Sequence, residues 1–127
     1  MKQKKPTEGE LQILKILWEN GPQTVRYVND EISKINEVGY TTTLKIMQIM
    51  SEKQLLSRNT SSRTHIYKAK IDQKDTQRHL LSSLMDVAFQ GSTSSLVLHA
   101  LGNHSTSNEE LSEIKALIEK LENQSKK

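Results

Sequence analysis

Polar side chains recur every three or four residues between Thr41 and Glu52, within a stretch that is otherwise largely apolar. A helix turns about 100° per residue, so four of these side chains would share a stripe about 60° wide: Thr41, Lys45, Gln48 and Glu52. Lys donates hydrogen bonds to guanine O6 and N7, and Gln pairs with adenine N6 and N7 in the major groove of DNA. The solvated face of an ordinary amphipathic helix has the same residue types, so the neighbouring segments decide between the two interpretations.

Two residues flank this stripe, and two further cations follow it in the sequence. The Thr42 hydroxyl can bond a phosphate or a base, and an Ile49 methyl group can pack against a thymine methyl group. Lys53 ends the same helix, and Arg63 lies at the tip of a predicted hairpin, where a wing meets the DNA backbone or the minor groove. We therefore predict DNA contacts from seven residues: Thr41, Thr42, Lys45, Gln48, Ile49, Lys53 and Arg63.

The segments around the stripe predict a small helical domain with a hairpin. Thr7-x-x-Glu10 is a capping box that starts a helix, and Asn20-Gly21-Pro22 ends it. A second helix follows Thr24, and the third runs from about residue 41 to 53. Residues 55–69 then favour two short strands around a polar turn. Three helices and a two- or three-stranded wing make a winged helix-turn-helix domain, which we place at residues 1–70.

Residues 71–127 predict a separate helical module, so that the fold is mainly α. Only 34% of the chain is apolar, which is lean for a domain that fills its own core. Such a chain often completes its core by pairing with a second copy. We expect a homodimer whose interface uses eleven apolar residues at helical spacing: Leu81, Leu84, Met85, Ala88, Leu96, Leu98, Leu111, Ile114, Leu117, Ile118 and Leu121.

The charge of the chain is unevenly distributed. The net charge is +3, but residues 1–70 hold 12 basic and 7 acidic residues, whereas residues 71–127 hold 6 and 8. Residues 38–70 contain six basic residues and a single acidic residue, Glu52. This asymmetry favours a polyanion such as double-stranded DNA as the partner of the first module.

Several function classes are excluded by what the 127 residues contain. The absence of Cys excludes disulfides, Cys-based zinc sites and thiol catalysis. His99 and His104 have no supporting carboxylate, so we predict no metal site and no cofactor. The Ser residues gather in turns and caps without an aligned base, so we predict no enzyme. No apolar run approaches the roughly 18 residues of a membrane span, so we expect a cytoplasmic protein without direct membrane insertion.

Five motifs in order carry a family resemblance: Glu10-Leu11-x-Ile13-Leu14-x-Ile16-Leu17-Trp18, Tyr40-Thr41-Thr42, Arg63-Thr64-His65-x-Tyr67, Ser95-Leu96-Val97-Leu98 and Ser107-x-Glu109-Glu110-Leu111. Over about residues 6–122 the chain resembles the penicillinase-repressor (BlaI/MecI-like) family. The resemblance implies a homodimeric bacterial transcriptional repressor in which each winged-helix domain reads half of a palindromic operator. It also implies a possible partner, the membrane-bound protease sensor that cleaves some members in response to β-lactams.

The chain departs from the family pattern at several positions. Ile49 stands where many members have Arg, and Gln54 stands where many have Gly. The first change implies a different operator sequence. His99-Ala100 stands where responsive members have the Asn-Phe pair that is cleaved, which argues against induction by proteolysis. A related branch senses copper through C-terminal cysteines, and this chain has none.

The sequence thus predicts a homodimeric, sequence-specific DNA-binding repressor that acts on a palindromic operator. Two alternatives stay open. One is a winged-helix regulator that senses a small molecule bound between the two modules. The other is a protein-interaction adaptor that keeps the winged-helix shape without binding DNA.

Overall fold

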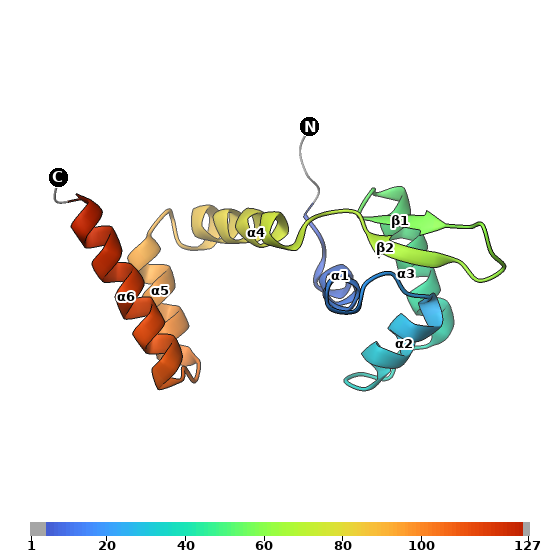
Figure 1. The fold of residues 1–127 in the computed structure, drawn as a ribbon, viewed down its shortest axis with the longest axis horizontal. Coiled ribbons are helices and arrows are strands. Elements are labelled where there is room, and N and C mark those ends of the chain that lie inside the picture. The colour runs from blue at the N-terminus through green and yellow to red at the C-terminus, as the bar shows by residue number, and fades with distance from the viewer. Residues whose placement is uncertain (1–4, 126–127) are drawn as a thin grey trace. The chain divides into compact units, whose positions relative to one another are not determined.

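The computed structural model describes residues 5–125 of the chain and confirms the mainly α fold class (Figure 1). Its contacts divide the chain into one unit up to Ser82 and a second unit from Ser83 onward. The first unit holds helices α1 (Glu8–Asn20), α2 (Val25–Ser33) and α3 (Tyr40–Glu52), strands β1 (Leu56–Asn59) and β2 (Ile66–Ala69), and the start of α4 (Gln73–Ala88). The second holds the rest of α4, α5 (Thr93–Asn103) and α6 (Asn108–Ser125). The predicted modules 1–70 and 71–127 meet just before α4, whereas the division between the units falls inside that helix.

The first helix begins at the predicted capping box. The Thr7 N–H donates to Glu10 Oε1 at 2.9 Å, and the Glu10 N–H donates to Thr7 Oγ1 at 3.2 Å. Gly21, with φ of +75°, ends α1 in the left-handed region that glycine adopts without steric cost. The reciprocal bonds satisfy two backbone donors that the first turn cannot pair by itself.

Helices α2 and α3 are joined by a turn that a buried amide holds in place. Thr24 caps α2 by accepting from the Tyr27 N–H at 3.1 Å, as predicted. From α2, Asn29 donates to the Val38 carbonyl at 2.8 Å and to Thr43 Oγ1 at 2.9 Å. Asn29 and Thr43 are both buried, so breaking this pair would leave unsatisfied polar groups in the core. The geometry of the helix-turn-helix is therefore fixed at its turn.

The end of α3 is a Schellman motif with an unusual residue in it. The Leu55 N–H donates to the Met50 carbonyl at 2.9 Å, and the Gln54 N–H donates to the Ser51 carbonyl at 3.2 Å. Gln54 adopts φ of +68°, a conformation that glycine usually occupies at this position. Leu55 and Met50 are both fully buried, so the motif also closes against the core.

The wing is a two-stranded antiparallel hairpin, in agreement with the prediction. Its register pairs Leu56 with Ala69, Ser57 with Lys68, Arg58 with Tyr67 and Asn59 with Ile66. Two backbone bonds between Gln23 and Tyr67, at 2.9 and 2.8 Å, tie β2 to the segment before α2. The core of the unit lies between the three helices and this hairpin, and its buried apolar residues are Ile13, Leu14, Leu17, Val25, Val28, Met47, Met50, Leu55, Leu56 and Tyr67.

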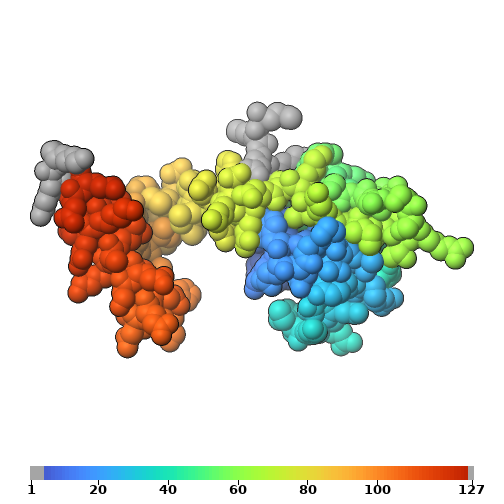
Figure 2. Space-filling model, in the orientation of Figure 1, coloured from blue at the N-terminus to red at the C-terminus, as the bar shows by residue number. Residues whose placement is uncertain are grey.

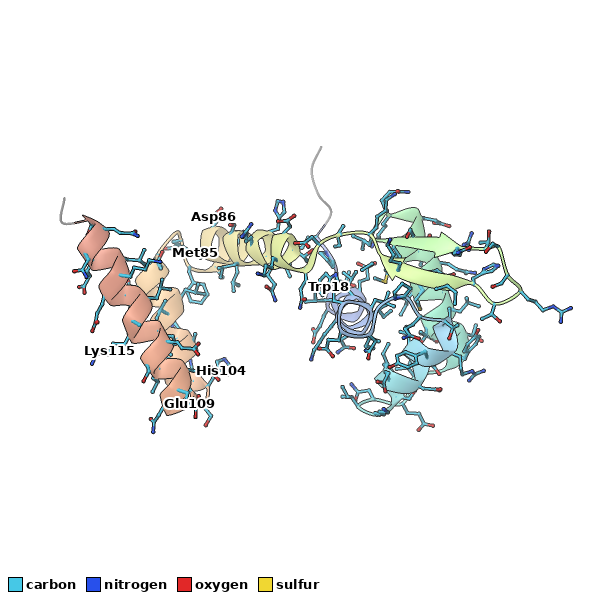
Figure 3. All side chains as sticks on the ribbon, in the orientation of Figure 1. Trp18, Met85, Asp86, His104, Glu109 and Lys115 are labelled. Carbon is cyan, nitrogen blue, oxygen red and sulfur yellow. The ribbon has the colours of Figure 1, made fainter. Side chains whose placement is uncertain are left out.

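The start of α4 is attached to α1. Trp18 of α1 (Figure 3) donates from Nε1 to the Ile71 carbonyl at 3.0 Å. Thr76 in α4 is buried, and its hydroxyl donates to the Asp72 carbonyl at 2.7 Å. Beyond this attachment the packing changes, because no apolar side chain of α4, α5 or α6 within the described residues is buried. No helix between residues 5 and 125 is long and apolar enough to cross a membrane.

Candidate nucleic-acid interface

Helix α3 separates a buried side from an exposed polar side. Thr43, Met47 and Met50 face the core and are almost fully buried. The predicted stripe and its two flanking residues lie on the other side. All six are exposed: Thr41, Lys45, Gln48 and Glu52 in the stripe, and Thr42 and Ile49 beside it. Arg63 is exposed as well. Six of the seven predicted contact residues are therefore available to a partner, and Lys53 is the exception.

The first turn of α3 also presents its backbone. Gly39 is the N-cap and has no side chain to accept a hydrogen bond from the first amides. The N–H groups at a helix start carry partial positive charge and suit an anionic partner. The exposed threonines Thr41 and Thr42 lie in this same turn.

Arg63 lies on the loop between β1 and β2, which projects beyond the helices of the first unit (Figure 2). Its neighbours Thr64 and His65 are also exposed. The tip of the wing can therefore contact a part of a bound partner that α3 does not reach.

Lys53 differs from the other predicted contacts, because the structure turns it toward α1. Its Nζ lies 2.8 Å from Glu10 Oε2, in an ion pair whose carboxylate side chain is only 6% exposed. Burial alone would raise the pKa of Glu10, but the hydrogen bonds from Lys53 and Thr7 outweigh it and hold the pKa below its ordinary value. Lys53 therefore has a structural partner that sequence spacing could not reveal.

Arg58 on β1 is a cation that the prediction left out. Side chains alternate along a strand, so Arg58 shares a face with the buried Leu56 and is directed toward the helices. It lines an open hollow of about 450 Å³ with Gln48, Ser51 and Glu52 of α3. Alternation with Leu56 was the sequence signal that could have placed it there.

Arg26 on α2 is a second cation that the prediction left out. Its guanidinium carbon lies 4.5 Å from the centroid of the Tyr40 ring, at the start of α3. Both residues line a smaller hollow of about 230 Å³ that Arg63, Thr64 and His65 of the wing close from the other side. The exposed surface of α3 thus has a hollow near each of its ends. One is lined by Arg26 and Arg63, and the other by Arg58 together with the acidic Glu52.

The helices α4–α6 carry the residues predicted for pairing. Most of these residues are exposed, and Leu98 and Leu117 leave 70% and 56% of their surface in solvent. Met85, Leu96 and Ile114 are half-buried, and Ala88 is exposed. Val87, which the prediction omitted, is 81% exposed. Helices α4–α6 thus present exposed apolar side chains among the described residues.

Acidic and imidazole groups do not converge anywhere in residues 5–125. No three His, Asp or Glu side chains lie close enough together there to hold a metal ion. His99 instead packs its ring against Phe89, with the centroids 5.6 Å apart.

Comparisons with known proteins identify two repressors that match most of the chain and two solved structures that match part of it. The penicillinase repressors of Bacillus licheniformis and Staphylococcus aureus are 25% and 22% identical to the chain, over 94% and 92% of its length and 94% and 93% of theirs. The solution structure of the DNA-binding domain of the repressor BlaI matches 58% of the chain and 90% of its own length, with a TM-score of 0.52 and 23% identity. The monomeric form of B. licheniformis BlaI in complex with the blaP half-operator matches the same shares, with a TM-score of 0.51.

These likenesses confirm the winged-helix fold of the first unit. The family model described as penicillinase repressor matches residues 6–120, which is nearly the whole chain. Transcriptional repressors are not a class of enzyme. The chain belongs to the penicillinase repressor family.

Proposed function

We propose that this chain is a homodimeric transcriptional repressor that binds a palindromic DNA operator in a sequence-specific way. The observation that carries the proposal is the exposed polar stripe of α3, which lies beside a projecting wing and a hollow lined by Arg26 and Arg63. The BlaI complex with a half-operator supports it, because that relative of the same fold binds DNA.

Within this proposal, α3 enters the major groove. Lys45 and Gln48 carry the base preference through hydrogen bonds, and Ile49 contributes an apolar contact to a thymine methyl group. Thr41 and Thr42, in the first turn, contact phosphates or bases. Arg63 approaches the backbone or the minor groove from the wing.

The structure leads us to revise one of the seven predicted contacts. Lys53 is held by Glu10 at 2.8 Å, so we assign it to positioning α3 rather than to DNA. Arg58 faces the exposed hollow beside Gln48, and the described residues offer its guanidinium no carboxylate within 4 Å. We therefore propose Arg58 as the phosphate contact near the C-terminal end of α3.

Pairing through α4–α6 supplies the second half of the proposal. Burying an exposed Leu side chain contributes roughly 1.5–3 kcal/mol before the costs of association. Several such residues lie on these helices without a covering element, including Leu98, Leu117 and Leu121. Two-fold pairing presents two recognition helices to half-sites about one DNA turn apart or a multiple of it, so the operator should be a palindrome.

The proposal does not include a membrane-bound protease as a partner. The positions at which responsive relatives are cut hold His99 and Ala100, and both lie inside α5.

Selection from random duplex DNA at two salt concentrations tests the proposal. We expect an enriched palindrome whose affinity falls steeply as salt rises. Gln48→Ala should then lower affinity for the palindrome much more than for unrelated duplexes. Failure to enrich any motif would favour the adaptor. If Gln48→Ala lowered the affinity for all DNA sequences equally, Gln48 would have no part in base readout.

An open groove favours a second candidate function, a regulator that senses a small apolar molecule. The groove holds about 390 Å³ between α1 and the first turns of α4, where Leu11, Trp18 and Leu80 give it a largely apolar lining. A ligand of this site should raise the Tm of the wild type but not of Leu80→Glu, and should change DNA affinity. A small-molecule screen in which no compound raises the Tm of the wild type above its effect on Leu80→Glu would count against a sensor.

A further inference from the structure

Arg26 is held in a defined position although its side chain is exposed. Its guanidinium carbon lies 4.5 Å from the Tyr40 ring centroid, which is the geometry of a cation–π contact. Within residues 5–125 no carboxylate lies within ion-pair distance of Arg26. The ring therefore orients the cation without neutralising its charge.

The hollow in front of Arg26 is lined by elements from both sides of the proposed DNA interface. Arg26 and Tyr40 line it from α2 and α3, and Arg63, Thr64 and His65 line it from the wing. None of the residues that line this hollow is acidic. It is a concave, positively charged surface of about 230 Å³, which suits a small anionic group.

The position of the hollow indicates which anion it receives. If α3 lies in the major groove and the wing meets the neighbouring minor groove, the sugar-phosphate backbone that separates the grooves must pass between them. The hollow lies between these two elements. Stacking uses the face of a guanidinium and leaves the N–H groups at its edge free to donate to phosphate oxygens.

We propose that Arg26 binds a phosphate of the DNA backbone between the two grooves, with Tyr40 as the positioning residue that orients its guanidinium. This inference rests on the proposed function. It adds an anchor on α2 to the contacts of α3 and the wing, so that one backbone strand is held from both sides.

The test compares the salt dependence of DNA binding in charge-matched variants of the full chain. Each phosphate contact contributes about 0.9 to the slope of log K against log salt. Arg26→Met should lower this slope by about 0.9 on every DNA sequence. Lys15→Met, which removes the same charge from the exposed side of α1, should leave the slope unchanged. Equal slopes for Arg26→Met and the wild type would overturn the inference.

Substitutions of Tyr40 test its positioning role. Tyr40→Phe keeps the ring and should bind as the wild type does. Tyr40→Leu should weaken binding several-fold, and the double variant Arg26→Met/Tyr40→Leu should bind no more weakly than Arg26→Met alone, because the ring acts through the cation. Additive losses would contradict that role. A wild type that binds no DNA would overturn the proposed function itself, which separates the two failures.

Discussion

At the scale of single residues, the ion pair of Glu10 and Lys53 shows where sequence reasoning reached its limit. The spacing of α3 predicted correctly which side chains are exposed, since that depends on helix geometry alone. It could not reveal that Lys53 has an ion-pair partner on α1, because Glu10 lies 43 residues away. Arg58 was left out of the predicted contacts, although its alternation with Leu56 along β1 was a sequence signal that could have placed it beside α3.

Lys53 and Arg58 should therefore respond differently to loss of charge. Lys53→Met leaves Oε2 of the buried Glu10 carboxylate without its donor, while Oε1 keeps the Thr7 N–H. It should destabilise the fold by about 1–3 kcal/mol, with an unchanged salt slope of DNA binding. Arg58→Gln should lower that slope by about 0.9 with little effect on stability. Lys68→Gln, on the opposite face of the same hairpin, is the matched control and should change neither quantity. The reverse pattern would return Lys53 to the DNA surface.

The Glu10 carboxylate also predicts a pH dependence of stability. Its folded pKa lies below the ordinary value of 4.5, so it contributes stability that is present above that value and is lost as pH falls through the folded pKa. The free energy of unfolding in urea should therefore decrease below about pH 4.5 by more in the wild type than in Glu10→Gln. Parallel pH profiles of the two proteins would show that the pair contributes nothing to folding.

At the scale of elements, the caps were the most predictable features and the strained end of α3 the least. The Thr7–Glu10 box and the Thr24 cap follow from local sequence because both partners lie within one turn. Ser107, directly before α6, likewise accepts at its hydroxyl from the Glu110 N–H at 3.1 Å. Gln54 is different, since nothing in its chemistry predicts the left-handed backbone that the core imposes on it.

Gln54→Gly should stabilise the domain. A non-glycine residue in the left-handed region costs roughly 1 kcal/mol, which glycine avoids at this position. The exposed hydrogen bond from Lys70 to the Gln54 side chain would be lost, with a smaller effect. We expect a higher Tm for Gln54→Gly and a lower Tm for Gln12→Gly, a control inside α1 where glycine weakens a helix. A lower Tm for both would show that the turn is not strained.

At the scale of the whole molecule, the chain combines a unit with its own core and three C-terminal helices in which no described apolar side chain is buried. The core residues all lie between Ile13 and Tyr67. The apolar periodicity of the C-terminal helices could be predicted from the sequence, because it needs only helical spacing. That a single chain leaves these residues exposed could not, since exposure depends on how the helices are placed.

A charge on this apolar surface should separate pairing from folding. Leu117→Glu places a carboxylate where the partner should pack, so we expect monomers in sedimentation equilibrium and an unchanged fold of the first unit. Affinity for a half-site should persist, while affinity for the palindrome should fall by at least tenfold. Ile35→Glu, at an even more exposed apolar residue of the first unit, should remain dimeric. A dimeric Leu117→Glu would remove this residue from the interface.

The central claim is that two copies of this chain read one palindrome, and native mass spectrometry of the wild-type protein on its selected duplex tests it most directly. We predict two chains per duplex with both half-sites intact, and one chain per duplex when one half-site is scrambled. A single chain on the intact palindrome, or the same stoichiometry on scrambled DNA, would contradict the account.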